Sequence, residues 1–187
     1  SPTLRGGRGC VLRLLDERSF PRRDNVVAFL AYLGGPESTT ALVRMLDRPV
    51  LPGASAEETR ALLLVPHALG RIAARGDRGA LGALLAMTAQ RAAARAPLVR
   101  AELREAAIAG LALVGKTAAR DRLAAIADGR VVPDPRHPEL AARARSVLGS
   151  LTAPPPGAAA ETAAPITAAV LYTPDPATRT RAHGLTF

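Results

Sequence analysis

Apolar residues recur at helical spacing along most of the chain, in groups that glycine-containing turns separate. When Gly34, Gly76 and Gly115 are placed in one column, the residues around them also align. The aligned apolar columns are Leu30, Ile72 and Leu111, then Leu42, Leu84 and Leu123, then Met45, Met87 and Ile126, and the aligned small residues are Ser38, Ala80 and Ala119. A repeat of about 40 residues with this pattern predicts helix pairs stacked side by side.

The first two helix pairs have recognisable starts and turns. The first pair is expected to begin at Ser19–Pro21 and to turn at Gly34–Pro36, since glycine ends helices and proline suits a first helical turn. In the second pair, Ser55 and Glu58 have the spacing of a capping box. Pro66 falls inside the helix that follows, where it removes one backbone hydrogen bond and should bend the axis.

A third pair and two partial repeats complete the predicted array. The third pair should begin at Pro97 and turn at Gly115, and a proline-broken loop follows over residues 131–138. An upstream half-repeat carries Leu12 and Leu15. The downstream half-repeat carries Leu148, Gly149 and Leu151, in the order of Leu69, Gly70 and Ile72.

These segments predict three regions and an all-α fold. Residues 1–151 are expected to form a right-handed α-solenoid of antiparallel helix pairs, followed by a Pro/Ala-rich tail. Residues 152–167 are mostly Ala, Pro and Thr, a composition typical of a flexible linker. Residues 168–187 read as a docking segment or the truncated start of a further domain. The chain also begins without methionine, which favours a piece of a longer protein.

Composition agrees with packed helices. Hydrophobic residues make up 48% of the 187 positions, aromatic residues only 3%, and tryptophan is absent. A core of Ala, Leu, Val and Ile is therefore expected. Cys10 is the single cysteine, which excludes an internal disulfide. Arginines interrupt every long apolar run, so we expect no membrane span and favour a soluble, cytoplasmic protein.

The strongly basic charge gives a first indication of partners. The formal charge is +9, which favours an acidic partner such as a protein face or a nucleic acid. Lys116 is the only lysine among 25 basic residues, and this Arg-for-Lys bias is also what a GC-rich genome produces. In a solenoid, the second helices would expose a ridge of arginines, and this ridge is our candidate partner-binding site: Arg44, Arg78, Arg120 and Arg122.

Nucleic-acid binding remains an alternative. Arg71, Arg75 and Arg78 flank one turn, and further arginines surround the next loop. Such a basic surface would bind phosphates with steep salt dependence. Acidic residues such as Asp77 and Asp121 are interspersed, however, and no aromatic side chain alternates with the arginines to stack on bases.

The repeat units resemble the HEAT-repeat family, in the short bacterial form that is similar to phycobilisome-lyase-like repeats. The resemblance rests on the turn glycines, on Pro66, and on the segments Ala68–Ala73 and Ile108–Ala112. It covers about residues 7–151. The resemblance implies an α-solenoid that serves as a scaffold or binding module, although members of this architecture also include inhibitors, lyases and nucleic-acid binders.

One segment matches the P-loop expression. Gly110–Thr117 reads G-x-x-x-x-G-K-T, in which Gly115, Lys116 and Thr117 would contact the phosphates and magnesium of a nucleotide. A P-loop follows a strand, whereas residues 101–109 have helical periodicity. The repeat alignment assigns the same residues to core and turn, so we expect no nucleotide site here.

No catalytic or metal-binding set is recognisable. His67, His137 and His183 are scattered, and no carboxylate lies at ligand spacing from them; His67 is expected to be packed or half-exposed. Ser146 and Ser150 lie in no G-x-S-x-G elbow. We therefore expect a non-enzymatic module without metal or cofactor. Protein interaction or scaffolding is the leading function, nucleic-acid binding is the alternative, and nucleotide binding comes third.

Overall fold

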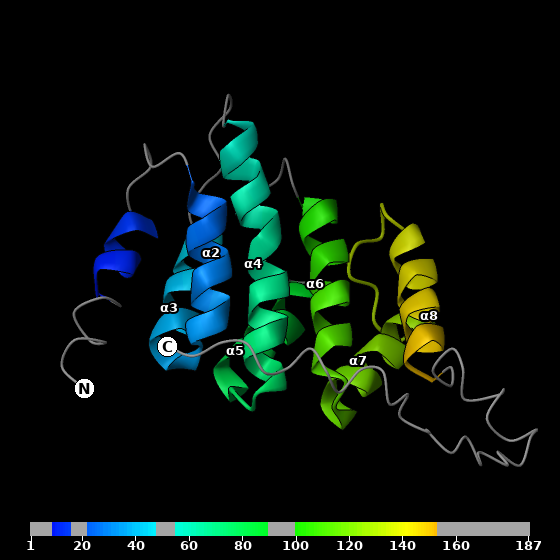
Figure 1. Ribbon diagram of the computed structural model, residues 1–187. Coiled ribbons are helices and arrows are strands. Elements are labelled where there is room, and N and C mark those ends of the chain that lie inside the picture. The colour runs from blue at the N-terminus through cyan, green and yellow to red at the C-terminus, as the bar shows by residue number, and fades with distance from the viewer. Residues whose placement is uncertain (1–8, 16–21, 48–54, 90–99, 153–187) are drawn as a thin grey trace, which may run out of the picture. The chain divides into compact units, whose positions relative to one another are not determined.

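The computed structural model describes residues 9–15, 22–47, 55–89 and 100–152 (Figure 1). Within these ranges every regular element is an α-helix and none is a strand, which confirms the predicted all-α class. A short helix over residues 9–15 precedes α2 (Arg23–Leu33), α3 (Gly35–Leu46), α4 (Ala56–Ala74), α5 (Arg78–Met87), α6 (Arg100–Val114), α7 (Thr117–Ala127) and α8 (Glu139–Thr152). The chain divides into two units, Ser1–Ala153 and Pro154–Phe187. The tail and all of the predicted linker except Thr152 lie outside the described residues, as do Ser19–Pro21 and Pro97.

The helices of the first unit form two rows. In the first row α2, α4, α6 and α8 contact one another in that order, and in the second row α3, α5 and α7 do the same. Figure 1 shows the second row behind the first. Each helix of the second row packs against the helix that precedes it in the chain. The first row is referred to below as the first-helix row and the second as the second-helix row.

Three glycines make the turns that join the rows, as the sequence predicts. Gly34, Gly76 and Gly115 have φ angles of 66°, 105° and 62°. This left-handed region is open to glycine at no steric cost, whereas a side chain would be strained there. The chain can therefore reverse direction within one to three residues between the helices of each pair.

The aligned apolar columns form the core. Leu30, Ile72 and Leu111 are at most 1% exposed, as are Leu42, Leu84 and Leu123. The small-residue column of Ser38, Ala80 and Ala119 is also buried completely. The third column departs from the prediction, because Met87 is only half-buried while Met45 and Ile126 are buried. Met87 is the last residue of α5, where fewer neighbours cover it.

The helices α4 and α6 meet at two glycines. A Cβ atom added to Gly70 would lie 2.5 Å from the carbonyl oxygen of Gly110. A Cβ atom added to Gly110 would lie 2.5 Å from the carbonyl oxygen of Pro66. The backbones therefore approach too closely for any side chain at this crossing. Pro66 lies inside α4, as the sequence predicts, and the helix continues through it.

The start of α4 is capped by half of the predicted capping box. The Ser55 hydroxyl accepts a hydrogen bond from the backbone N–H of Glu58 at 3.1 Å. The Glu58 carboxylate lies 3.6 Å from the guanidinium of Arg23 on α2. Serine thus caps α4, while the glutamate contributes to packing between α2 and α4.

The last helix differs from the predicted half-repeat. Leu148 and Leu151 are half-buried and Gly149 is exposed, whereas Leu69, Gly70 and Ile72 in α4 are buried. Within the described residues α8 is the last helix of its row, so one side of it has no neighbour. The helix also extends one residue beyond the predicted boundary at Leu151, because the Thr152 hydroxyl donates to the carbonyls of Leu148 and Gly149.

Candidate interaction surfaces

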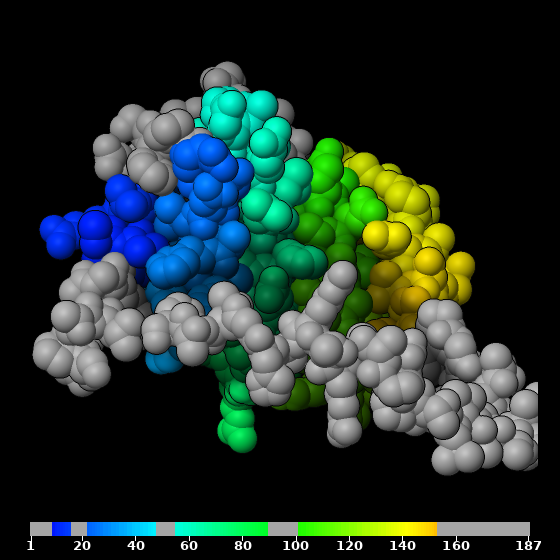
Figure 2. All heavy atoms as spheres, viewed as in Figure 1, coloured from blue at the N-terminus to red at the C-terminus, as the bar shows by residue number. Residues whose placement is uncertain are grey.

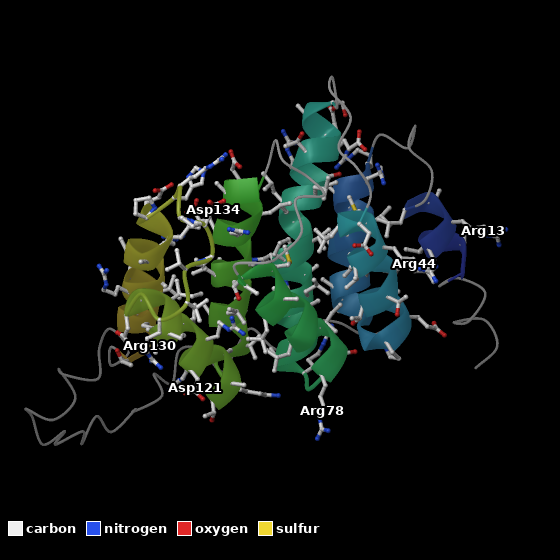
Figure 3. All side chains as sticks on the ribbon, turned by 180° about the vertical axis from the view of Figure 1, so that it is seen from behind. Arg13, Arg44, Arg78, Asp121, Arg130 and Asp134 are labelled. Carbon is white, nitrogen blue, oxygen red and sulfur yellow. The ribbon has the colours of Figure 1, made fainter. Side chains whose placement is uncertain are left out.

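The four arginines predicted to form a binding ridge all lie in the second-helix row. Arg44 on α3, Arg78 at the start of α5 and Arg120 on α7 are exposed, and Arg122 is half-buried. Figure 3 shows Arg44 beside the short 9–15 helix and Arg78 projecting from α5 at the bottom of the view. Asp121 projects from α7 in the same view, and in the sequence it stands between Arg120 and Arg122. The row therefore carries arginines on three helices, with an acidic residue among them.

A surface pocket of about 350 Å³ adjoins Arg44. It lies between the short 9–15 helix, which contributes Leu12, and α3. The α3 residues that line it are Pro36, Glu37, Thr40, Ala41 and Arg44. Arg44 thus faces a local pocket with a carboxylate in its wall.

Three other arginines stabilise the ends of helices. Each donates hydrogen bonds to backbone carbonyls in the last turn of a helix next to its own. The pairs are Arg23 Nη2 to Leu15 O at 2.9 Å, Arg75 Nη1 to Tyr32 O at 2.9 Å with Nη2 to Ala31 O, and Arg145 Nε to Ala127 O at 3.1 Å. The last carbonyls of a helix lack partners within it and carry its negative dipole end. Some of the many arginines therefore cap the C-terminal ends of neighbouring helices.

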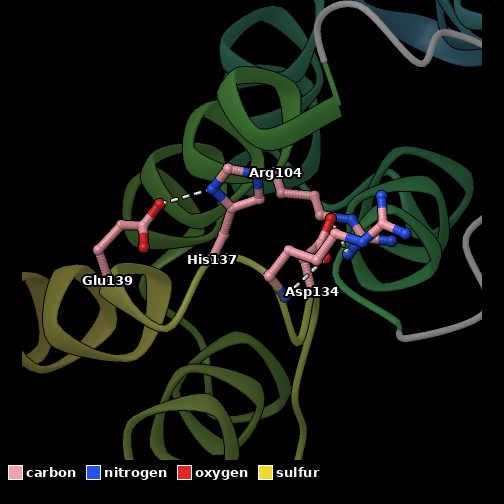
Figure 4. A network of polar contacts seen from close by, with 5 residues as sticks. Arg104, Asp134, His137 and Glu139 are labelled. Atoms are coloured by element: carbon pink, nitrogen blue, oxygen red, sulfur yellow. Dashed lines mark hydrogen bonds and ion pairs between the residues drawn. The ribbon is translucent and has the colours of Figure 1, made fainter.

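A fourth arginine forms a buried ion pair that holds the loop after α7 (Figure 4). Arg104 Nη1 on α6 lies 3.3 Å from Asp134 Oδ2, and both side chains are at least 93% buried. The other carboxylate oxygen accepts the backbone N–H of Arg136 at 3.1 Å. This backbone hydrogen bond and the Arg104 guanidinium lower the pKa of Asp134, although burial opposes them. The pair fastens residues 128–138 to α6.

The histidine of this loop has a close carboxylate partner. His137 Nδ1 lies 2.7 Å from Glu139 Oε1. A hydrogen bond with the His137 side chain contributes to a lowered pKa of Glu139, after the larger effect of backbone N–H donation at the start of α8. His67 is exposed on α4 rather than packed or half-exposed as predicted, because its position falls on the outer side of the helix.

The P-loop-like segment forms a helix, a turn and a second helix. Gly110–Val114 belongs to α6 and Gly115 makes the turn. Lys116 is the N-cap of α7 and Thr117 its first residue, and both side chains are exposed. The backbone amides that would surround a phosphate are instead part of α6 up to Val114, and Gly110 packs against Pro66. Since α6 precedes Gly110, where a P-loop requires a strand, the segment has the geometry of a repeat turn.

The first-helix row exposes the two aromatic side chains of the described residues. Phe29 is 46% exposed and Tyr32 is 72% exposed, both on α2. They lie three residues apart on the side opposite to the buried Val26, Val27 and Leu30. Phe29 and Tyr32 fall outside the columns that repeat along the chain, so the repeat pattern does not predict them, although their spacing out of phase with the apolar columns was a usable signal.

The neighbouring helix α4 exposes a line of mostly basic residues. Arg60, Leu64, His67 and Arg71 are exposed and follow one another at spacings of four, three and four residues. Residues 60–74 contain no Asp or Glu. Figure 2 looks onto the row that contains α2 and α4. We refer to Phe29 and Tyr32 with Leu64, His67 and Arg71 as the α2–α4 face.

Other kinds of site find no support in the part of the chain that the structure describes. No group of three or more His, Cys, Asp or Glu side chains is placed to hold a metal ion there. None of the described helices combines the length and apolarity needed to cross a membrane. Comparison of the chain with family models, curated proteins and solved structures found no match.

Proposed function

We propose that the chain is a protein-interaction or scaffolding module built as a right-handed α-solenoid of the HEAT-repeat type. Three features support this proposal: the repeated apolar columns, the glycine turn within each pair, and the two rows of helices in sequential contact. In such an array each repeat packs mainly on its neighbours, which leaves long helical faces open for partners.

The exposure of Phe29 and Tyr32 is the observation that carries the proposal. A helical protein with so few aromatic residues would gain most by burying them, because aromatic side chains bury large apolar areas. Both are instead on the surface of α2. Tyrosine and arginine are enriched among the residues that dominate protein–protein binding energy, and Arg71 lies on the adjacent helix.

The arginines of the second-helix row remain a second candidate surface. Arg44, Arg78, Arg120 and Arg122 would serve an acidic partner by steering it and fixing its orientation, since exposed charges change association rates more than affinity. Asp121 and Glu37 lie among them, so the positive field of this row is interrupted.

Nucleic-acid binding is the second candidate function. One observation favours it: two exposed aromatic rings lie beside a helix whose exposed line is basic, and base stacking with phosphate contacts uses this combination. The arginines that cap helix ends, Arg23, Arg75 and Arg145, already donate to backbone carbonyls and so contribute less to such a surface.

Affinity capture from lysate of the source organism at two salt concentrations tests the proposal. Wild type is compared with Tyr32→Ser and with Lys116→Ala, and co-purifying protein and nucleic acid are both identified. The proposal predicts a defined protein that survives higher salt, is reduced in Tyr32→Ser and is unchanged in Lys116→Ala. Recovery of nucleic acid alone, lost as salt rises, would contradict it.

A further inference from the structure

Arg75, the residue that follows α4, links the ends of α2 and α4. Its guanidinium donates to the carbonyls of Ala31 and Tyr32, which places the last turn of α4 beside the last turn of α2. One turn earlier on the exposed sides of the two helices are Arg71 and Phe29. The repeat alignment gives the same register, since Gly34 and Gly76 end the two helices. Arg71 therefore lies on the adjacent helix at the level of the aromatic pair.

Acidic side chains lie on both helices that flank α4 in the first-helix row. On α6 these are the exposed Glu102 and Glu105, and Glu105 lies 3.4 Å from Arg143 of α8. On α2, Asp24 lies 3.8 Å from Arg22. The basic line of α4 is thus bordered by acidic groups on both neighbouring helices.

We propose that the α2–α4 face binds an acidic amphipathic helix of a partner protein, an inference that rests on the proposed function. The apolar stripe of such a helix covers Phe29, Tyr32 and Leu64, in the way an amphipathic helix lays its apolar face on an apolar surface. Carboxylates next to that stripe pair with Arg71, whose planar guanidinium accommodates a carboxylate through two hydrogen bonds.

The width of the basic line favours this partner over a nucleic acid. A single row of carboxylates along a helix needs cations on one line only, which α4 supplies. A nucleic-acid backbone spreads its charge over a broader track and would meet the exposed Glu102 and Glu105 on α6.

Selection from a displayed library of helical peptides tests the inference on the full chain. Enriched peptides are sequenced and synthesised with a fluorescent label, and their dissociation constants are measured by anisotropy. The proteins compared are wild type, Tyr32→Ser, Arg71→Glu and the control Arg130→Glu. The control makes the same charge change as Arg71→Glu at an exposed arginine in the loop after α7, outside both candidate surfaces. Circular dichroism checks that each variant keeps its helical content.

The inference predicts peptides in which Asp or Glu lies three or four residues from Leu or Phe. Binding should weaken at least about tenfold in Tyr32→Ser and in Arg71→Glu, as expected for interface residues of this type, and stay within about twofold in Arg130→Glu. Failure to enrich any peptide, enrichment without acidic residues, or equal affinity in all four proteins would overturn it.

Two further results separate the inference from the proposed function. A labelled single-stranded oligonucleotide is titrated against the same proteins, and binding that is lost in Tyr32→Ser and Arg71→Glu would overturn the inference in favour of nucleic acid. A partner protein captured from lysate that depends on Arg120 and not on Tyr32 would overturn the inference while leaving the proposed function in place.

Discussion

Replacement of Gly70 by alanine tests the packing on which the two-row arrangement depends. The added methyl group would lie 2.5 Å from the carbonyl oxygen and 2.9 Å from the Cα atom of Gly110. Both are backbone atoms of α6, so relief requires the two helices to move apart. The movement would reach the core that α4 and α6 share, including Leu69 and Leu111, which are completely buried.

The size of the effect follows from two opposing contributions. Overpacking of a close contact typically costs about 1–3 kcal/mol, and we expect a clash with backbone atoms to lie at the upper end of this range, about 3 kcal/mol. Alanine is favoured over glycine inside a helix by about 1 kcal/mol, which offsets part of this cost. We therefore expect Gly70→Ala to lower the free energy of unfolding by roughly 2 kcal/mol. For a chain of this size the melting temperature would fall by about 4–8 °C.

Two exposed glycines provide matched controls. A Cβ atom added to Gly82 in α5 or to Gly149 in α8 would meet no atom within 4 Å. The same substitution there should raise stability by roughly 0.5–1 kcal/mol through helix propensity alone. Urea and thermal unfolding followed by circular dichroism would measure all three variants. Gly70→Ala as stable as Gly149→Ala would refute the close approach of α4 and α6.

Three further substitutions test individual contacts. Ser55→Ala should destabilise the protein by about 1 kcal/mol through loss of the α4 cap, and Ser55→Thr should retain most of the cap, as urea unfolding will show. Arg75→Met removes the donors to the end of α2 and should cost roughly 1 kcal/mol, whereas Arg71→Met on the exposed side of the same helix should be close to neutral in the same assay. The folded-state pKa of Asp134 is lowered from its ordinary value of 3.8. The ionised carboxylate therefore contributes its full stabilisation of the folded protein above that value, and this stabilisation is lost as pH falls through the lower pKa. Unfolding curves recorded from about pH 2 to about pH 6 should therefore show a smaller loss of stability on acidification for Asp134→Asn than for wild type. Equal pH dependence of the two proteins would contradict the role given to this carboxylate.

The sequence was most informative where the same local pattern of apolar residues and glycines repeats along the chain. The glycines at 34, 76 and 115 could be placed in turns because each ends an apolar stripe at the same position, and all three adopt positive φ angles. The core leucines of the same repeats could be predicted for the same reason. These features depend on residues close together in the chain, so their pattern survives without knowledge of the tertiary structure.

Contacts between distant segments were beyond the sequence pattern. Arg75 was grouped with the arginines around its own turn, but it donates to carbonyls 43 and 44 residues earlier in the chain. Every residue carries a backbone carbonyl, so no residue type marks such an acceptor. The crossing of Gly70 and Gly110 did leave a signal, because glycine inside a helix is unfavourable unless close packing requires it.

The candidate surface was predicted only in part. Arg44, Arg78 and Arg120 are exposed on the second helices, whereas Arg122 is only half-exposed, and the role of these four arginines in binding remains a prediction. The aromatic residues of α2 were missed because they fall outside the repeated columns. Single residues that differ between repeats are where a binding site is expected, since the shared positions are occupied by core and turns.

Site-specific photocrosslinking tests the central claim most directly. A photoreactive phenylalanine derivative would replace Tyr32 in one protein and Arg120 in another, and each would be irradiated in lysate of the source organism. The account predicts that position 32 crosslinks to a defined protein and that position 120 gives a much weaker product. Crosslinks to nucleic acid at position 32, or to a protein at position 120 alone, would contradict the account.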